Sequence, residues 1–117
     1  MICTKAAEVA GLINAKLNNV SIETETRNLI NDPTTFNYDV ILLGDVFYDQ
    51  EFADLLHPWL EKVLENNQKI IIGDPERHAL KSNMKLNLLA KYSLPENICI
   101  ENHGFKYTNV WEYIKVN

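Results

Sequence analysis

The sequence predicts an α/β fold built on a parallel sheet, and three observations lead to this class. Residues 38–44 and 69–73 are apolar on both faces, which is typical of buried parallel strands. Residues 51–66, which separate them, have the apolar spacing of an amphipathic helix. Strands that alternate with helices favour a three-layer arrangement. A chain of 117 residues allows one domain, which we expect to span residues 1–117.

The first third of the chain predicts a helix, a short strand and a turn. Residues 4–19 carry apolar side chains at helical spacing, and Thr4 is placed to cap the helix. The β-branched residues within Ser21–Thr26 favour a short strand. Residues 31–34, Asn-Asp-Pro-Thr, have the composition of a turn.

Pro58 interrupts the helical pattern of residues 51–66. A proline inside a helix removes a backbone donor, and its ring clashes with the preceding turn. We therefore expect this helix to be kinked or broken in two.

The last third predicts a helix followed by a hairpin. Residues 81–92 carry Met84, Leu88 and Leu89 at helical spacing. Residues 98–101 and 107–116 are read as two strands, joined by a turn over residues 102–105. An antiparallel hairpin at the end of such a sheet is common.

Composition excludes several classes of function. The formal net charge of −5 disfavours nucleic acid as the main partner, because phosphate binding requires a basic surface. Cys3 and Cys99 form no CxxC pair, so we expect neither a disulfide framework nor a zinc site. No two histidines have the spacing of metal ligands, and no apolar run is long enough to span a membrane.

Two Gly-Asp pairs follow the two apolar strands directly. Gly44-Asp45 ends the first strand and Gly73-Asp74 ends the second. In an open α/β sheet, ligands bind outside the carboxyl ends of the strands. A Gly-Asp pair is also an ordinary turn or helix cap, but two in tandem, with Tyr48 nearby, favour a binding site.

These segments resemble a known enzyme family. Asp45-Val46-Phe47-Tyr48 is similar to the DxxY motif that follows the fourth strand in seven-stranded S-adenosylmethionine-dependent protein methyltransferases, many of which act on lysine. Residues 71–75 with Arg77 are similar to a GDPxR segment found in a mitochondrial branch of this family. That branch methylates the β subunit of the electron transfer flavoprotein. DxxY alone is a weak signal, whereas the combined run is fairly specific.

The resemblance implies roles for individual residues. Asp45 and Tyr48 would be catalytic, because a carboxylate can hold the lysine amine and an aromatic ring can stabilise the developing cation. Gly44, Asp45 and Phe47 would contact S-adenosylmethionine, although Phe47 also suits the hydrophobic core. Asp74 and Arg77 would line the substrate mouth or pair with each other to pin their loop. His57 is expected to have an ordinary packing or surface role.

The resemblance covers only the C-terminal half of the family fold. These 117 residues contain neither the glycine-rich loop that cradles the cofactor nor the acidic residue that binds its ribose. We therefore expect weak cofactor binding and little activity from this chain alone. In the related fold the first strand lies beside the fourth, so the edge of residues 38–44 should be open unless residues 21–26 fill it.

The resemblance also implies a location and leaves alternatives. It points to the mitochondrial matrix, but residues 1–5 do not read as a transit peptide, and the cytoplasm is otherwise the default. A non-catalytic, methyltransferase-like binding module is the alternative function, and the missing glycine loop favours it for the isolated chain. A receiver-like phosphoacceptor domain would need a lysine after the second apolar strand, where Asp74 and Pro75 stand instead.

Overall fold

The computed structural model describes residues 4–47, 49–75, 84–101 and 104–115. The chain divides into two compact units, residues 1–35 and residues 36–117. The single domain expected over residues 1–117 stays a prediction.

The first unit is built around helix α1 (Lys5–Leu17). Thr4 caps it in an extended conformation, and its hydroxyl accepts a hydrogen bond from the Ala7 N–H at 3.1 Å. This bond satisfies one of the backbone donors that a helix start leaves without an intrahelical partner. Both the helix and its cap confirm the sequence prediction.

Residues 21–26 form no strand, so the prediction of a short strand there is wrong. Their side chains meet α1 instead of a neighbouring strand. The Thr24 hydroxyl donates to the Glu8 carboxylate at 3.2 Å, and the Ile22 side chain lies next to Gly11. β-Branched composition favours a strand only where a pairing partner exists, and these contacts take its place.

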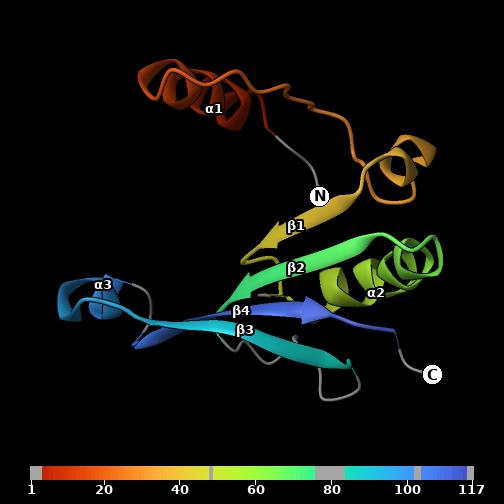
Figure 1. The fold of residues 1–117 in the computed structure, drawn as a ribbon. Helices are drawn as coiled ribbons and strands as arrows, with labels where there is room; N and C mark the ends of the chain where they lie inside the picture. Colours follow the sequence, from red (N-terminus) through yellow and green to blue (C-terminus); the bar gives the residue numbers. More distant parts are fainter. Residues whose placement is uncertain (1–3, 48, 76–83, 102–103, 116–117) are drawn as a thin grey trace. The chain divides into compact units, whose positions relative to one another are not determined.

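The second unit contains a four-stranded mixed sheet (Figure 1). A short 3₁₀ helix, η1 (Pro33–Asn37), leads into it at the predicted turn. Its strands are β1 (Val40–Gly44), β2 (Lys69–Asp74), β3 (Leu86–Ser93) and β4 (Tyr107–Tyr113), in the spatial order β1-β2-β4-β3. β1 and β2 are parallel and adjacent, as the sequence predicts.

Strand β1 is an edge strand, because only β2 pairs with it in the described part of the chain. The open edge expected for residues 38–44 is therefore confirmed. Such an edge leaves a row of backbone N–H and C=O groups available for pairing.

Helix α2 (Gln50–Glu65) covers one face of this sheet, as Figure 1 shows beside β2 and β4. Pro58 lies inside a single 16-residue helix, so the helix is not broken in two. The buried face of α2 consists of apolar side chains: Ala53, Leu56, Trp59, Leu60, Val63 and Leu64. They pack toward Ile70 and Ile72 of β2, which are both fully buried.

The elements after β2 differ from the sequence prediction. Residues 86–93 form strand β3 rather than part of a helix, and residues 81–83 of that predicted helix lie outside the described residues. Residues 96–101 form helix α3 (Glu96–Glu101) rather than a strand. The hairpin predicted over residues 98–116 is therefore wrong: β4 forms its antiparallel pair with β3 instead, and α3 lies between the two strands in the sequence. This antiparallel pair is called the β3–β4 hairpin below.

Pairing explains both errors. β4 is flanked by β2 on one side and by β3 on the other, so it offers no free edge to residues 98–101. Leu88 and Leu89 fit a helical pattern by spacing, yet they lie in β3, which pairs with β4 and has a β-bulge between Leu88 and Ala90. Tertiary pairing thus overrides the local pattern. No helix among the described residues is long and apolar enough to cross a membrane.

Removing a core side chain of α2 tests this packing. Leu60 is fully buried, so Leu60→Ala should lower the free energy of unfolding by about 2–5 kcal/mol through lost contacts and the cavity left behind. Leu55, on the same helix, is 64% exposed, and Leu55→Ala should change it by less than about 0.5 kcal/mol. Urea denaturation measures both, and equal effects would show that α2 does not pack as described.

Tyr113 makes a second contact between the sheet and α2, and this contact depends on pH. Its hydroxyl donates to the Glu61 carboxylate at 2.5 Å. Burial, together with this hydrogen bond, raises the pKa of Tyr113 above its ordinary value of 10.0. A pKa raised by folding gives stability that is fully present below pH 10.0 and is lost as the pH rises above it.

The variant Tyr113→Phe should therefore lower stability by about 1 kcal/mol at neutral pH and remove part of the loss seen above pH 10.0. Denaturant titrations between neutral pH and pH 11 check this, with Tyr38→Phe as the control because Tyr38 is 57% exposed. Identical pH profiles for the Tyr113 variant and the unmodified protein would contradict it.

Candidate active site

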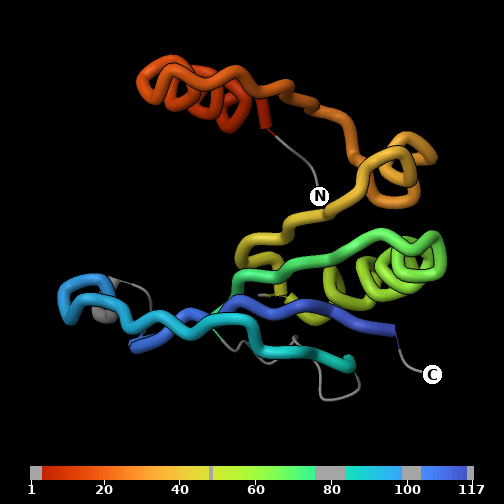
Figure 2. Tube along the Cα trace, in the orientation of Figure 1, coloured from red at the N-terminus to blue at the C-terminus, as the bar shows by residue number. Residues whose placement is uncertain are grey.

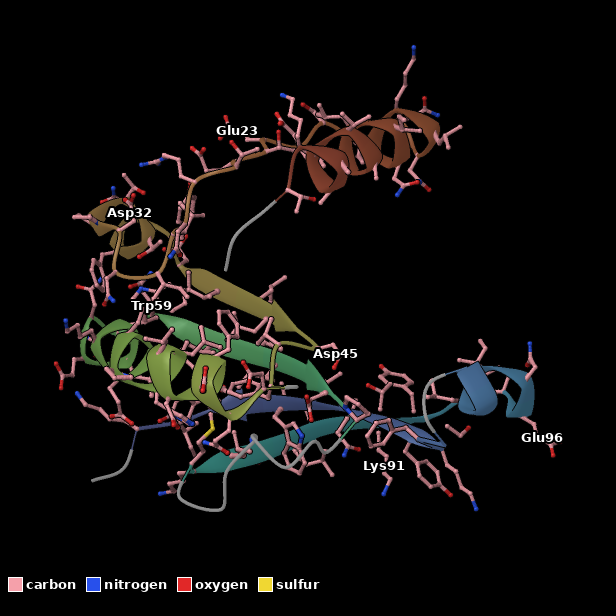
Figure 3. The ribbon with its side chains drawn as sticks, turned by 180° about the vertical axis from the view of Figure 1, so that it is seen from behind. Glu23, Asp32, Asp45, Trp59, Lys91 and Glu96 are labelled. Atoms are coloured by element: carbon pink, nitrogen blue, oxygen red, sulfur yellow. The ribbon has the colours of Figure 1, made fainter. Side chains whose placement is uncertain are left out.

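The carboxyl ends of β1 and β2 meet at one edge of the sheet. The two strands pair in register from Val40↔Lys69 to Gly44↔Gly73, so both end at a glycine. One residue further, the Asp45 N–H donates to the Gly73 C=O at 2.8 Å. The parallel pairing thus places Asp45 at this edge (Figure 3). This is where open α/β sheets bind ligands.

Asp45 turns the chain away from the sheet through a left-handed backbone conformation. Its φ angle is 49°, a region that aspartate tolerates better than most residues. Asp45 is exposed to solvent. A Cβ atom placed at Gly44 would meet no atom of the described residues within 4 Å, so those residues leave space at the end of β1.

The apolar residues of the same loop are buried. Val46 is 5% exposed and Phe47 is fully buried, and the Phe47 ring packs 6.1 Å from the His57 ring of α2. Burial confirms the core position expected for Phe47, and the ring contact agrees with a packing role for His57. The contact of Phe47 with a cofactor stays a prediction.

Helix α2 starts directly after this loop. The Asp49 side chain caps the helix by accepting a hydrogen bond from the Glu51 N–H at 3.3 Å. The loop therefore runs from a strand end to a helix start, with its apolar side chains fixed in the core. Asp45 is left at the surface, held by its backbone on one side and by these packed residues on the other.

Asp74 occupies a different environment from Asp45. It ends β2, directly opposite Asn109 of β4, and the exposed fractions of the two side chains are 0% and 1%. Buried polar groups are costly unless neighbouring groups satisfy them, and each of these two residues makes at least one such interaction. The predicted role of Asp74 at a substrate mouth and the shared cleft with Asp45 stay predictions.

Sequence reasoning missed Asn109. Its only signal was an amide side chain in the middle of an otherwise β-favouring run, residues 107–113. Two other candidates, Tyr48 and Arg77, lie outside the described residues. Within the ranges that the structure describes, no group of three or more His, Cys, Asp or Glu side chains could hold a metal ion.

This arrangement can bind a cationic or hydrogen-bond-donating group. Asp45 presents a carboxylate at the open end of β1, where Gly44 leaves room for a ligand to approach. A carboxylate held at a fixed edge can accept hydrogen bonds from an amine and set its orientation.

Curated proteins are similar in sequence to this protein along most of the chain. The Danio rerio electron transfer flavoprotein beta subunit lysine methyltransferase is 37% identical over 112 residues, or 92% of this chain and 43% of that protein. The Mus musculus protein of the same name is 35% identical over 114 residues, or 92% of this chain and 44% of its own length. The chain is a homologue of these lysine methyltransferases.

A Caenorhabditis elegans homologue of the same methyltransferase is 40% identical over 82 residues, or 62% of this chain and 34% of that protein. The chain therefore spans less than half the length of the relatives it matches. No family model and no solved structure matched it. The relatives confirm the resemblance drawn from residues 45–48 and from residues 71–75 with Arg77.

The left-handed conformation of Asp45 gives a test that does not depend on activity. Asp45→Val should lower the free energy of unfolding by about 1–2 kcal/mol, because a β-branched residue is strained at positive φ. Asp45→Asn should leave it within about 0.5 kcal/mol, since asparagine tolerates this region. Urea denaturation distinguishes them, and equal stability of the two variants would show that the turn has another conformation.

Proposed function

We propose that this lysine methyltransferase homologue takes part in methyl transfer from S-adenosylmethionine to a lysine of the electron transfer flavoprotein β subunit. The observation that carries the proposal is Asp45, an exposed carboxylate held at the carboxyl edge of β1 and β2 in a chain homologous to enzymes of that name. The mitochondrial matrix, where the resemblance places the family branch, is the proposed location.

Asp45 would position the substrate amine. Methyl transfer requires a neutral lysine amine whose lone pair points at the methyl carbon, whereas free lysine is protonated at neutral pH. A carboxylate that accepts the amine hydrogens directs the lone pair away from itself and holds the nitrogen in place. Asp45 can do this because its backbone is hydrogen-bonded to Gly73 while the residue is exposed to solvent.

The described residues fit the reactive end of the cofactor. When bound, S-adenosylmethionine supplies an activated methyl group on a positively charged sulfur. The open space at Gly44 allows close approach to the strand end, and the Asp45 carboxylate gives that end a negative charge. The sequence holds no glycine-rich loop to bind the rest of the cofactor, so the fit is limited to this contact.

Replacing the Asp45 carboxylate by an amide tests the proposal. Asp45→Asn keeps the shape and the backbone conformation, but it removes the charge and places an N–H donor against the substrate amine. Methylation of purified electron transfer flavoprotein β subunit should fall by about a hundredfold or more. Mass spectrometry of the β subunit, incubated with the protein and S-adenosylmethionine, measures it.

Asp39→Asn is the matched control. Asp39 is exposed at the opposite, amino end of the same strand, so its variant should methylate at the unmodified rate. Unchanged methylation by Asp45→Asn would contradict the role of Asp45. A folded protein that binds the β subunit without any methyl transfer would instead favour the alternative, a non-catalytic binding module.

A further inference from the structure

A polar row crosses the sheet at the carboxyl edge. Asp74 of β2 is paired with Asn109 of β4, and Asn109 is paired in turn with Lys91 of β3. Residues paired directly across neighbouring strands point to the same face. Lys91 therefore lies on the same face as Asp74, at the outer end of a row that begins beside Asp45.

The β3–β4 hairpin continues past this edge. Asp74 is the last residue of β2, whereas the pairs Tyr92↔Thr108 and Ser93↔Tyr107 follow within the hairpin alone. Figure 2 shows both strands running beyond the ends of β1 and β2 toward α3. Tyr107 is two residues before Asn109, so it shares the face of Lys91.

Tyr107 holds the Lys91 side chain in place. The Lys91 ammonium lies 4.6 Å from the centre of the Tyr107 ring, within the range of a cation–π interaction. Both residues are exposed, and Tyr107 is 48% exposed although it is a large aromatic side chain. Among the described residues no carboxylate lies within 4.0 Å of the Lys91 ammonium. Within that part of the chain, the ring orients the charge and no ion pair neutralises it.

We propose that Lys91, held against Tyr107, binds an acidic side chain of the protein substrate. The inference rests on the proposed function, because that function places the target lysine at Asp45. An anionic partner follows from charge complementarity: Asp45, beside the site end of the row, has an exposed carboxylate, and Lys91, at the outer end, has an exposed ammonium. A substrate lying along this edge would place its target lysine at Asp45 and an acidic side chain at Lys91.

Strand spacing predicts how far apart these two substrate residues are. Neighbouring strands lie about 4.8 Å apart, so β1 and β3, three spacings apart, are separated by about 14 Å. An extended substrate rises about 3.3 Å per residue. The acidic side chain should therefore lie about three to five residues from the target lysine.

Peptide binding tests the subsite without requiring methyl transfer. The probes are fluorescent peptides with one central lysine and a single Glu, Gln or Lys placed one to seven residues away on either side. Fluorescence anisotropy with the purified protein should show Glu binding about threefold to fivefold more tightly than Gln at a distance of three to five residues. High salt should weaken this preference, because the ion pair is exposed.

Charge reversal identifies Lys91 as its source. Lys91→Glu should reverse the preference at that distance, so that the peptide with the second Lys binds more tightly than the one with Glu. Tyr107→Leu should reduce the preference without reversing it, since the ring only orients the ammonium. Lys85→Glu is the matched control: Lys85 is exposed and precedes β3 at the opposite end of the hairpin, so the preference should persist.

Two outcomes would overturn the subsite: an unchanged preference in Lys91→Glu, or no peptide in the set that binds. If the preference reverses in Lys91→Glu but the protein methylates no lysine, the proposed function is contradicted and the subsite is retained. If Lys91→Glu leaves both the methylation of the β subunit and the peptide preference unchanged, the subsite is contradicted and the proposed function is retained.

Discussion

The in-register pairing of β1 with β2 is the constraint on which the candidate site depends. Because both strands end at a glycine of the same pair, the next N–H, that of Asp45, meets the Gly73 C=O at 2.8 Å. A slip of one residue would move every side chain of β1 to the other face and separate these two groups. The position of the Asp45 carboxylate is therefore set by backbone hydrogen bonds that involve no side chain of the site.

Helix α2 supplies the second restraint on the same loop. Val46 and Phe47 are buried in the core, and Asp49 caps the helix, so three described residues within four positions of Asp45 are anchored. Sites built on the ends of strands and helices hold their side chains more precisely than sites on long loops. This explains how Asp45 can be both exposed and well positioned. It also means that a change in the packing of α2 would shift the position of Asp45.

Local pattern was enough to predict α1 and α2, whose apolar residues recur at helical spacing, and β1 and β2, which are short apolar runs that end at a glycine. It failed for β3 and α3, whose identities depend on which segment pairs with β4. Asp45 could be placed from sequence, because it follows a strong strand directly. The burial of Asp74 against Asn109 and the contact of Lys91 with Tyr107 could not, because they require the register between strands that are distant in sequence.

The face of β1 turned away from α2 is exposed and apolar, unlike the buried core. Val40 and Leu42 alternate with the half-buried Ile41 and Leu43, and they are 44% and 73% exposed. Full burial of such a side chain contributes about 1.5–3 kcal/mol to the free energy of folding. Burial therefore stabilises one face of this strand, whereas the side chains on the other face do not gain this contribution. β1 also has an open edge among the described residues, as β3 has on the other side of the sheet. Yet β1 carries Asp45. Anything that covers this face or this edge would stabilise the β1–β2 pairing, and through the Asp45–Gly73 hydrogen bond it would also stabilise the geometry of the site.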